Sequence, residues 1–202
     1  MNSVEPTGPQ FNEHERKLHE TAKLAEDLVA GLLGFDAALT LLDDDRVLQL
    51  VPPRKPGKLV PEGKLAHLDS EHGHNYHFLF YLDHIRKEPN RTLTKRLWAS
   101  NSLIRIGDQL SRYNYFDRHP NLELVRHLRN AVAHGERITI DKPQVLSRFP
   151  AHLTAGLCHW EITPALHDQS LYSFVSAGDI CSIIQAIGIF LHNRSLERHV
   201  QR

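Results

Sequence analysis

The sequence has no hydrophobic run long enough to cross a membrane. A spanning helix needs about 20 consecutive apolar residues, and the longest candidate among the 202 residues, positions 180–191, is interrupted by Gln185. The first residues, MNSVEPTGPQ, also lack the basic start and the apolar stretch of a secretion signal. We therefore expect a cytoplasmic protein without membrane contact.

Cysteine is scarce, with only Cys158 and Cys181 in the chain. A secreted domain held together by disulfides would carry more cysteines, so both are expected to be reduced thiols. Cys158 precedes His159, a pairing that suits a thiol nucleophile. Its place on an expected strand beside Trp160 favours a buried structural cysteine instead.

Charge of one sign is not in excess either, because 24 basic side chains balance 24 acidic ones. The balance neither excludes nor indicates a nucleic-acid partner, but the distribution is uneven. Residues 1–50 are predominantly acidic and residues 86–137 predominantly basic. We therefore look for an anionic ligand in the middle of the chain, with solvated helix faces as the alternative interpretation.

The composition, 41% hydrophobic and 24% charged, is that of a globular protein. It predicts a single domain over residues 10–200, preceded by a flexible N-terminus at residues 1–9. The proline- and glycine-rich stretch 51–64 predicts a loop between helices.

Apolar residues recur at spacings of three and four along most of the chain, a pattern typical of amphipathic helices. They predict helices over residues 10–42, 70–87, 92–115, 121–134 and 180–191, the last with Asp179 as its N-cap. Two short strands are expected around residues 157–162 and 171–175. The predicted fold is all-α, an antiparallel helical bundle with a short β-hairpin inserted before the last helix.

Chemistry-bearing side chains gather in LRNAVAHGER, residues 128–137, at the end of the fourth expected helix. Asn130 and His134 are four residues apart and lie on one helix face, and the Arg129 side chain is long enough to reach them. A guanidinium binds phosphate oxygens in pairs, and an imidazole transfers protons near neutral pH. These three residues predict a small phosphate-processing site, unless Arg129 and His134 only cap the helix C-terminus.

The segment from Arg129 to His134 resembles the signature of the HEPN domain family, in which Arg is followed four to six residues later by His, commonly with a polar residue directly after the Arg. The helical frame is also similar to this family. A hairpin around Trp160, followed by Ala177-Gly178-Asp179-Ile180 at the start of the last helix, resembles a plasmid- or defence-associated bacterial branch.

This resemblance implies a metal-independent endoribonuclease that needs no cofactor, acts as a homodimer and serves as a toxin or an antiphage effector. The His134 side chains of the two protomers would act as base and acid on single-stranded RNA. Arg129 would stabilise the charge on the phosphate, and Asn130 would hold His134 or a phosphate oxygen in place. Arg126 and Arg137, which flank these residues, are assigned to RNA binding.

One departure from the family pattern keeps a different class of function open. Family members paired with a nucleotidyltransferase antitoxin often carry Tyr two residues after the motif His, whereas this chain has Glu136. The sequence does not decide whether an antitoxin or regulatory partner of another kind binds this chain. The alternative function is a non-catalytic HEPN-like dimer that binds RNA, a nucleotide or a partner protein.

A second group of candidate ligands lies in the His-rich segment 67–84. Its members are His67, Asp69, Glu71, His72, His74, His77, Asp83 and His84. No recognised metal-ligand spacing is present, so a solvated or partly buried helix face is favoured over a metal site. The aromatic residues Tyr76, Phe78, Phe80 and Tyr81 are interpreted as core and interface packing rather than as a base-stacking platform.

Overall fold

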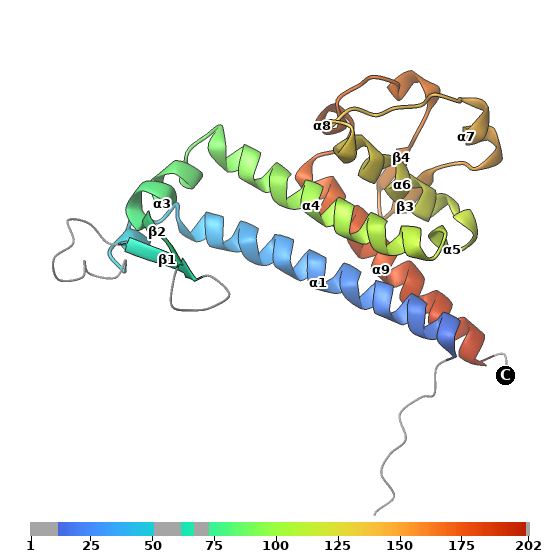
Figure 1. Cartoon of the computed structure of the whole chain (residues 1–202), viewed down its shortest axis with the longest axis horizontal. Helices are drawn as coiled ribbons and strands as arrows, with labels where there is room; N and C mark the ends of the chain where they lie inside the picture. Colours follow the sequence, from blue (N-terminus) through green and yellow to red (C-terminus); the bar gives the residue numbers. More distant parts are fainter. Residues whose placement is uncertain (1–11, 51–61, 67–72, 201–202) are drawn as a thin grey trace, which may run out of the picture. The chain divides into compact units, whose positions relative to one another are not determined.

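The computed structural model describes residues 12–50, 62–66 and 73–200. Figure 1 shows that this part of the chain is mostly helical, with two short antiparallel hairpins. The predicted mostly-α class with a small hairpin is confirmed. Residues 1–9, for which the sequence predicts flexibility, lie outside the described residues.

The chain divides into two compact units. The larger unit comprises residues 1–31 and 98–202, and the smaller unit comprises residues 32–97. Each is described by itself below, and the single domain over residues 10–200 stays a prediction. Two helices, α1 (Glu13–Leu41) and α4 (Asn90–Arg112), continue from one unit into the other.

The larger unit contains most of the secondary structure. Besides its parts of α1 and α4, its elements are α5 (Tyr115–Arg118), α6 (Pro120–Ala133), α7 (Gln144–Arg148), β3 (His152–Ala155), β4 (Cys158–Glu161), the 3-10 turn η1 (Pro164–Leu166), α8 (Leu171–Phe174) and α9 (Ala177–Val200). Its core consists of the apolar faces that the spacing pattern predicts. Leu18, Leu103, Leu128 and Ile184, from α1, α4, α6 and α9, are fully buried.

Local signals fix the ends of α6, the helix that carries the motif. His119 is the N-cap and its Nδ1 accepts a hydrogen bond from the Asn121 N–H at 3.3 Å, while Pro120 occupies the first turn. Gly135 follows the helix with a φ of +77°, a conformation that glycine adopts without steric cost. The predicted helix over residues 121–134 is therefore confirmed.

The last helix begins earlier than predicted. Ser176, not Asp179, is the capping residue: the Ser176 Oγ accepts from the Asp179 N–H at 3.1 Å, and the Ser176 N–H donates to Asp179 Oδ2 at 2.8 Å. This reciprocal pair is a capping box, which places the acidic residue in the first turn rather than before it.

The hairpin before the last helix uses different strands from those predicted. His152–Ala155 pairs with Cys158–Glu161, and the tight turn between them contains Gly156 at a φ of +58°. Residues 171–174 form α8 instead of a strand. Cys158 is exposed at this turn, so the expectation of a buried thiol is wrong.

The smaller unit holds α2 (Asp45–Leu48), β1 (Glu62–Ala66), β2 (Gly73–His77) and α3 (Phe78–Arg86). The sequence predicts a helix from about residue 70, but residues 73–77 pair with β1 as a strand. Helix α3 therefore starts only at Phe78, where His77 Nδ1 accepts a hydrogen bond from the Phe80 N–H at 3.1 Å. Residues 51–61 of the predicted loop lie outside the described part of the chain, and residues 62–64 belong to β1.

The aromatic residues of this unit pack against one another at its surface. Tyr76 stacks on Phe78 with ring centroids 6.2 Å apart, and Phe80 contacts Tyr81 edge to face at 5.2 Å. Phe80 is 59% exposed and Tyr81 47% exposed. None of the four rings is buried, so the core part of this prediction is wrong, whereas packing at an interface stays a prediction.

Helices α4 and α6 approach each other closely at Gly107. A Cβ placed on Gly107 would lie 2.7 Å from the Cβ and 2.6 Å from the Cγ of Arg129. These atoms belong to the stem of the arginine next to the α6 backbone, so they cannot move aside as a side-chain end would. Gly107 is therefore what allows the Arg129 stem to lie flat against α4.

We expect Gly107→Ala to destabilise the protein by about 1–3 kcal/mol, the usual cost of overpacking a close contact. The measurement is urea unfolding followed by circular dichroism. Gly31→Ala is the matched control, because a Cβ on that helical glycine meets nothing within 4 Å, and it should stabilise by about 0.5–1 kcal/mol. Equal effects of the two substitutions would contradict the close contact.

Candidate functional site

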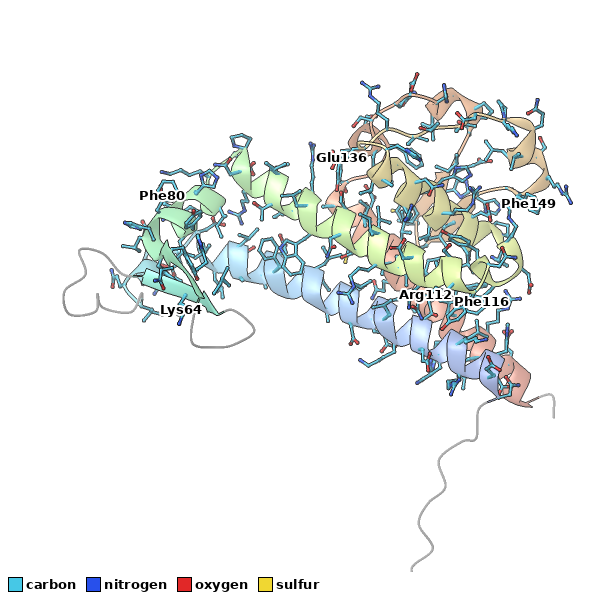
Figure 2. All side chains as sticks on the ribbon, viewed as in Figure 1. Lys64, Phe80, Arg112, Phe116, Glu136 and Phe149 are labelled. Atoms are coloured by element: carbon cyan, nitrogen blue, oxygen red, sulfur yellow. The ribbon has the colours of Figure 1, made fainter. Side chains whose placement is uncertain are left out.

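The C-terminal half of α6 lines a hollow of about 240 Å³ in the larger unit. Arg126, Asn130 and His134 are spaced four residues apart and form a stripe along this face of the helix. The residues that line the hollow are Arg126, His127, Asn130, His134, Thr139, Ile140, Asp141, Lys142, Val145 and Leu146. Figure 2 labels Glu136, which follows α6, and Phe149, which follows α7, so both bordering segments can be found there.

The structure brings together three of the five predicted site residues. Asn130, His134 and Arg126 line the hollow, whereas Arg129 and Arg137 do not. Arg137 is exposed, and its Nη1 donates to the backbone carbonyl of Asp168 at 2.7 Å. This hydrogen bond links the segment after α6 to the segment before α8.

Arg129 precedes Asn130 by one residue, which places it about 100° around the helix axis from the stripe, and it faces α4. Its Nε and Nη2 donate to Asp108 Oδ1 at 2.9 and 2.7 Å. Its Nη1 also lies 3.5 Å from the Oδ1 of Asn130. The expected convergence of Arg129 on His134 is absent, because a carboxylate on the neighbouring helix pairs with the guanidinium first.

A buried carboxylate anchors the other end of the stripe. Glu123 is fully buried, and it accepts hydrogen bonds from Arg118 at 2.9 and 3.1 Å and from Arg126 Nε at 2.7 Å. Burial raises the pKa of the Glu123 carboxyl, but the hydrogen bonds from both guanidiniums outweigh it and hold the pKa below its ordinary value. Arg118 in turn stacks on Phe149, with its guanidinium carbon 3.6 Å from the ring centroid.

His127 is a site residue that the sequence analysis missed. Burial, and then the charge of Arg126, lower the pKa of this imidazole from 6.5 to about 4. His127 is therefore neutral at neutral pH, and its Nε2 accepts a hydrogen bond from Arg126 Nη2 at 3.0 Å. Its spacing from Asn130 and His134, three and seven residues, was the signal that placed it on the same face.

His134 marks the solvent side of the hollow. It is the C-cap of α6, where its backbone N–H donates to the Asn130 carbonyl, and its side chain is exposed. Within the described part of the chain, its imidazole has no hydrogen-bond partner. An exposed imidazole beside an amide and cationic side chains can exchange protons with a bound phosphate ester.

The His-rich segment does not form a ligand cluster in its described part. Residues 67–72 lie outside the described residues, and the rest of the described chain contains no group of three or more His, Cys, Asp or Glu side chains arranged to hold a metal ion. His77 caps α3, and His84 stacks on Phe80 at 6.0 Å. Both imidazoles have structural contacts there.

The comparisons with known proteins add no family to this picture. No family model, no curated protein and no solved structure matches the chain. Across residues 12–50, 62–66 and 73–200, no helix combines the length and apolar character that a membrane span requires. The HEPN resemblance therefore depends on the motif and its helix, and it stays a prediction.

The low pKa of His127 predicts that stability depends on pH below 6.5. Between pH 6.5 and about 4, the unfolded chain binds a proton at this imidazole that the native protein does not bind. As the pH is lowered through this window, the free energy of unfolding should therefore decrease. The decrease should be roughly 3 kcal/mol in total, at about 1.4 kcal/mol per pKa unit. Urea titrations across this window measure it.

His127→Gln should flatten this pH profile, because glutamine has no proton to gain. His119 offers a second test, since burial and the charge of Arg194 lower its pKa as well. The double substitution with His119→Gln should flatten the profile further than either change alone. Identical slopes for the parent and His127→Gln would contradict the assignment of a neutral buried imidazole.

Proposed function

We propose that this chain is a metal-independent endoribonuclease that cuts single-stranded RNA at the hollow beside α6. The observation that supports it best is the convergence of His134 and Asn130 with Arg126, His127 and Lys142 on one hollow. Proton-transfer groups, an amide and cations are the set that phosphodiester cleavage requires. In cells the enzyme would act as a toxin or an antiphage effector.

The reaction uses a nucleophile that the RNA itself supplies. The ribose 2′-oxygen attacks the adjacent phosphorus and gives its proton to an imidazole, so that the O2′–P bond forms. The P–O5′ bond then breaks, and the 5′-oxygen takes a proton from a second imidazole. The products are a 2′,3′-cyclic phosphate and a 5′-hydroxyl, with His134 as the exposed proton-transfer group and Asn130 as its neighbour.

We further propose that the active form is a homodimer. In this arrangement the His134 side chains of two protomers face one another across the RNA, and they divide the roles of base and acid. The exposed position of His134 at the solvent side of the hollow is compatible with a partner approaching there. An antitoxin or regulatory protein would control the activity by covering the same surface.

One observation favours a second candidate, the non-catalytic module that binds RNA, a nucleotide or a protein. Arg129 is already paired with Asp108 and does not line the hollow. If the motif arginine serves only to hold α6 against α4, the remaining groups still bind a phosphate without cleaving it.

Cleavage of an end-labelled single-stranded RNA by the purified chain in excess EDTA decides between the two. We expect the parent to leave cyclic-phosphate ends, and His134→Ala to reduce the rate by about 10²–10⁴, as loss of a general acid or base does. Asn130→Ala should reduce it less, because the amide orients groups and transfers no proton.

Two matched variants serve as controls. His159→Ala removes an exposed imidazole on β4, and Asn101→Ala removes an exposed amide on α4, both away from the hollow. Both should cut at the parent rate. A parent that binds RNA but leaves it intact, while folded and dimeric, would support the binding module and refute the nuclease.

A further inference from the structure

We propose that Lys142 and Arg126 hold the scissile phosphate in the hollow, and that Arg129 is a positioning residue that does not touch the RNA. This assignment rests on the proposed RNA-cleaving function and moves the charge-stabilising role from the motif arginine to the loop before α7. It follows from which cations line the hollow and which are already paired.

Lys142 is the cation with the fewest constraints at the site. It lines the hollow from the segment between α6 and α7, opposite the helix stripe, and its side chain is exposed. It forms no ion pair with any residue that the structure describes. A phosphate therefore meets a lysine ammonium without first breaking a salt bridge, and the flexible stem lets the charge follow the phosphate.

Arg126 supplies a second cation whose position is fixed. Its Nε donates to Glu123 and its Nη2 to His127, whereas its Nη1 donates to none of the described residues. Because Arg118 shares Glu123, two guanidiniums face one carboxylate and a net positive charge remains. Asp141, which also lines the hollow, cancels this single positive charge, so a net attraction to phosphate requires the charge of Lys142.

The contacts of Arg129 are those of a positioning residue. Two of its nitrogens bind Asp108, and its stem packs on Gly107, so the guanidinium points toward α4 and away from the hollow. Its Nη1 donates to Asn130 Oδ1 at 3.5 Å. That contact leaves the Asn130 Nδ2 to donate to a phosphate oxygen, so Arg129 acts on the site through Asn130.

The test combines cleavage with binding of an RNA that cannot be cut. The probes are a labelled single-stranded RNA of mixed sequence and its fully 2′-O-methylated counterpart, whose 2′-oxygen has no proton to lose. Lys142→Gln should lower the single-turnover cleavage rate about 10²-fold, as loss of one charge-stabilising donor does. It should also weaken binding of the methylated RNA and make the slope of log K against log salt shallower by about 0.7, the value for one lost phosphate contact on a single strand.

Two variants control for the loss of charge. Lys142→Arg keeps the cation and should restore both binding and salt slope. Lys23→Gln removes an exposed lysine that pairs with Asp27 on α1, and it should leave both unchanged.

Substitutions of the Arg129–Asp108 pair separate positioning from direct contact. Arg129→Met keeps the stem on Gly107 and should slow cleavage while leaving the salt slope as in the parent. Asp108→Asn should slow cleavage as well, with no further loss in the double variant. If Arg129 bound the phosphate, releasing it from Asp108 would preserve cleavage, and Arg129→Met would flatten the salt slope.

The outcomes separate this inference from the proposed function. A parent that cuts RNA while Lys142→Gln keeps the parent rate and salt slope would overturn the Lys142 assignment and leave the nuclease standing. A parent that binds RNA but does not cut it would refute the nuclease function. The salt slope of Lys142→Gln would then still test whether Lys142 contacts a phosphate. A parent that neither binds nor cuts refutes both.

Discussion

The site depends on one buried ionic contact, that of Glu123 with Arg118 and Arg126. A fully buried carboxylate is costly unless hydrogen bonds satisfy it, and here two guanidiniums do so. Arg118 reaches Glu123 from a turn in which every residue from 114 to 118 has a positive φ. Such a conformation costs roughly 1–2 kcal/mol per residue for L-amino acids. Burial of the side chains of Tyr115 and Phe116, two residues of this turn, offsets part of that cost.

From this anchor the hollow acquires two kinds of side chain, some held by hydrogen bonds and some exposed. Arg126 is held by Glu123 and by His127, and the low pKa of His127 keeps its imidazole neutral, so that it accepts the hydrogen bond from Arg126. By contrast, His134 at the end of α6 and Lys142 on the segment after it are exposed, and no described residue holds their side chains. Preorganised side chains reduce the reorganisation needed when charge develops on a substrate, while the exposed groups retain the freedom to exchange protons and follow a phosphate.

The features that the sequence predicted correctly are those that interactions between neighbouring residues determine. The spacing of apolar residues located the long helices, and the four-residue spacing placed Asn130 and His134 on one face. What failed depends on contacts between distant segments. Residues 73–77 became a strand because β1 pairs with them, and the environment of His127 depends on the arrangement around it, which no spacing in the sequence reveals.

Arg129 shows how the surroundings of a motif residue, and not its spacing alone, decide which atoms it contacts: it binds Asp108 and does not line the hollow. Its spacing to His134 is that of the family signature, yet each helical residue advances about 100° around the axis, which turns Arg129 off the stripe. Whether it curls back depends on what lies on the neighbouring helix, and there Gly107 makes room for its stem and Asp108 binds its guanidinium. Because Asp108 on α4 pairs with that charge, the proposed phosphate contact falls to the cations that line the hollow, Arg126 and Lys142. On this proposal, the loop after α6 matters to the site as much as the helix that carries the motif.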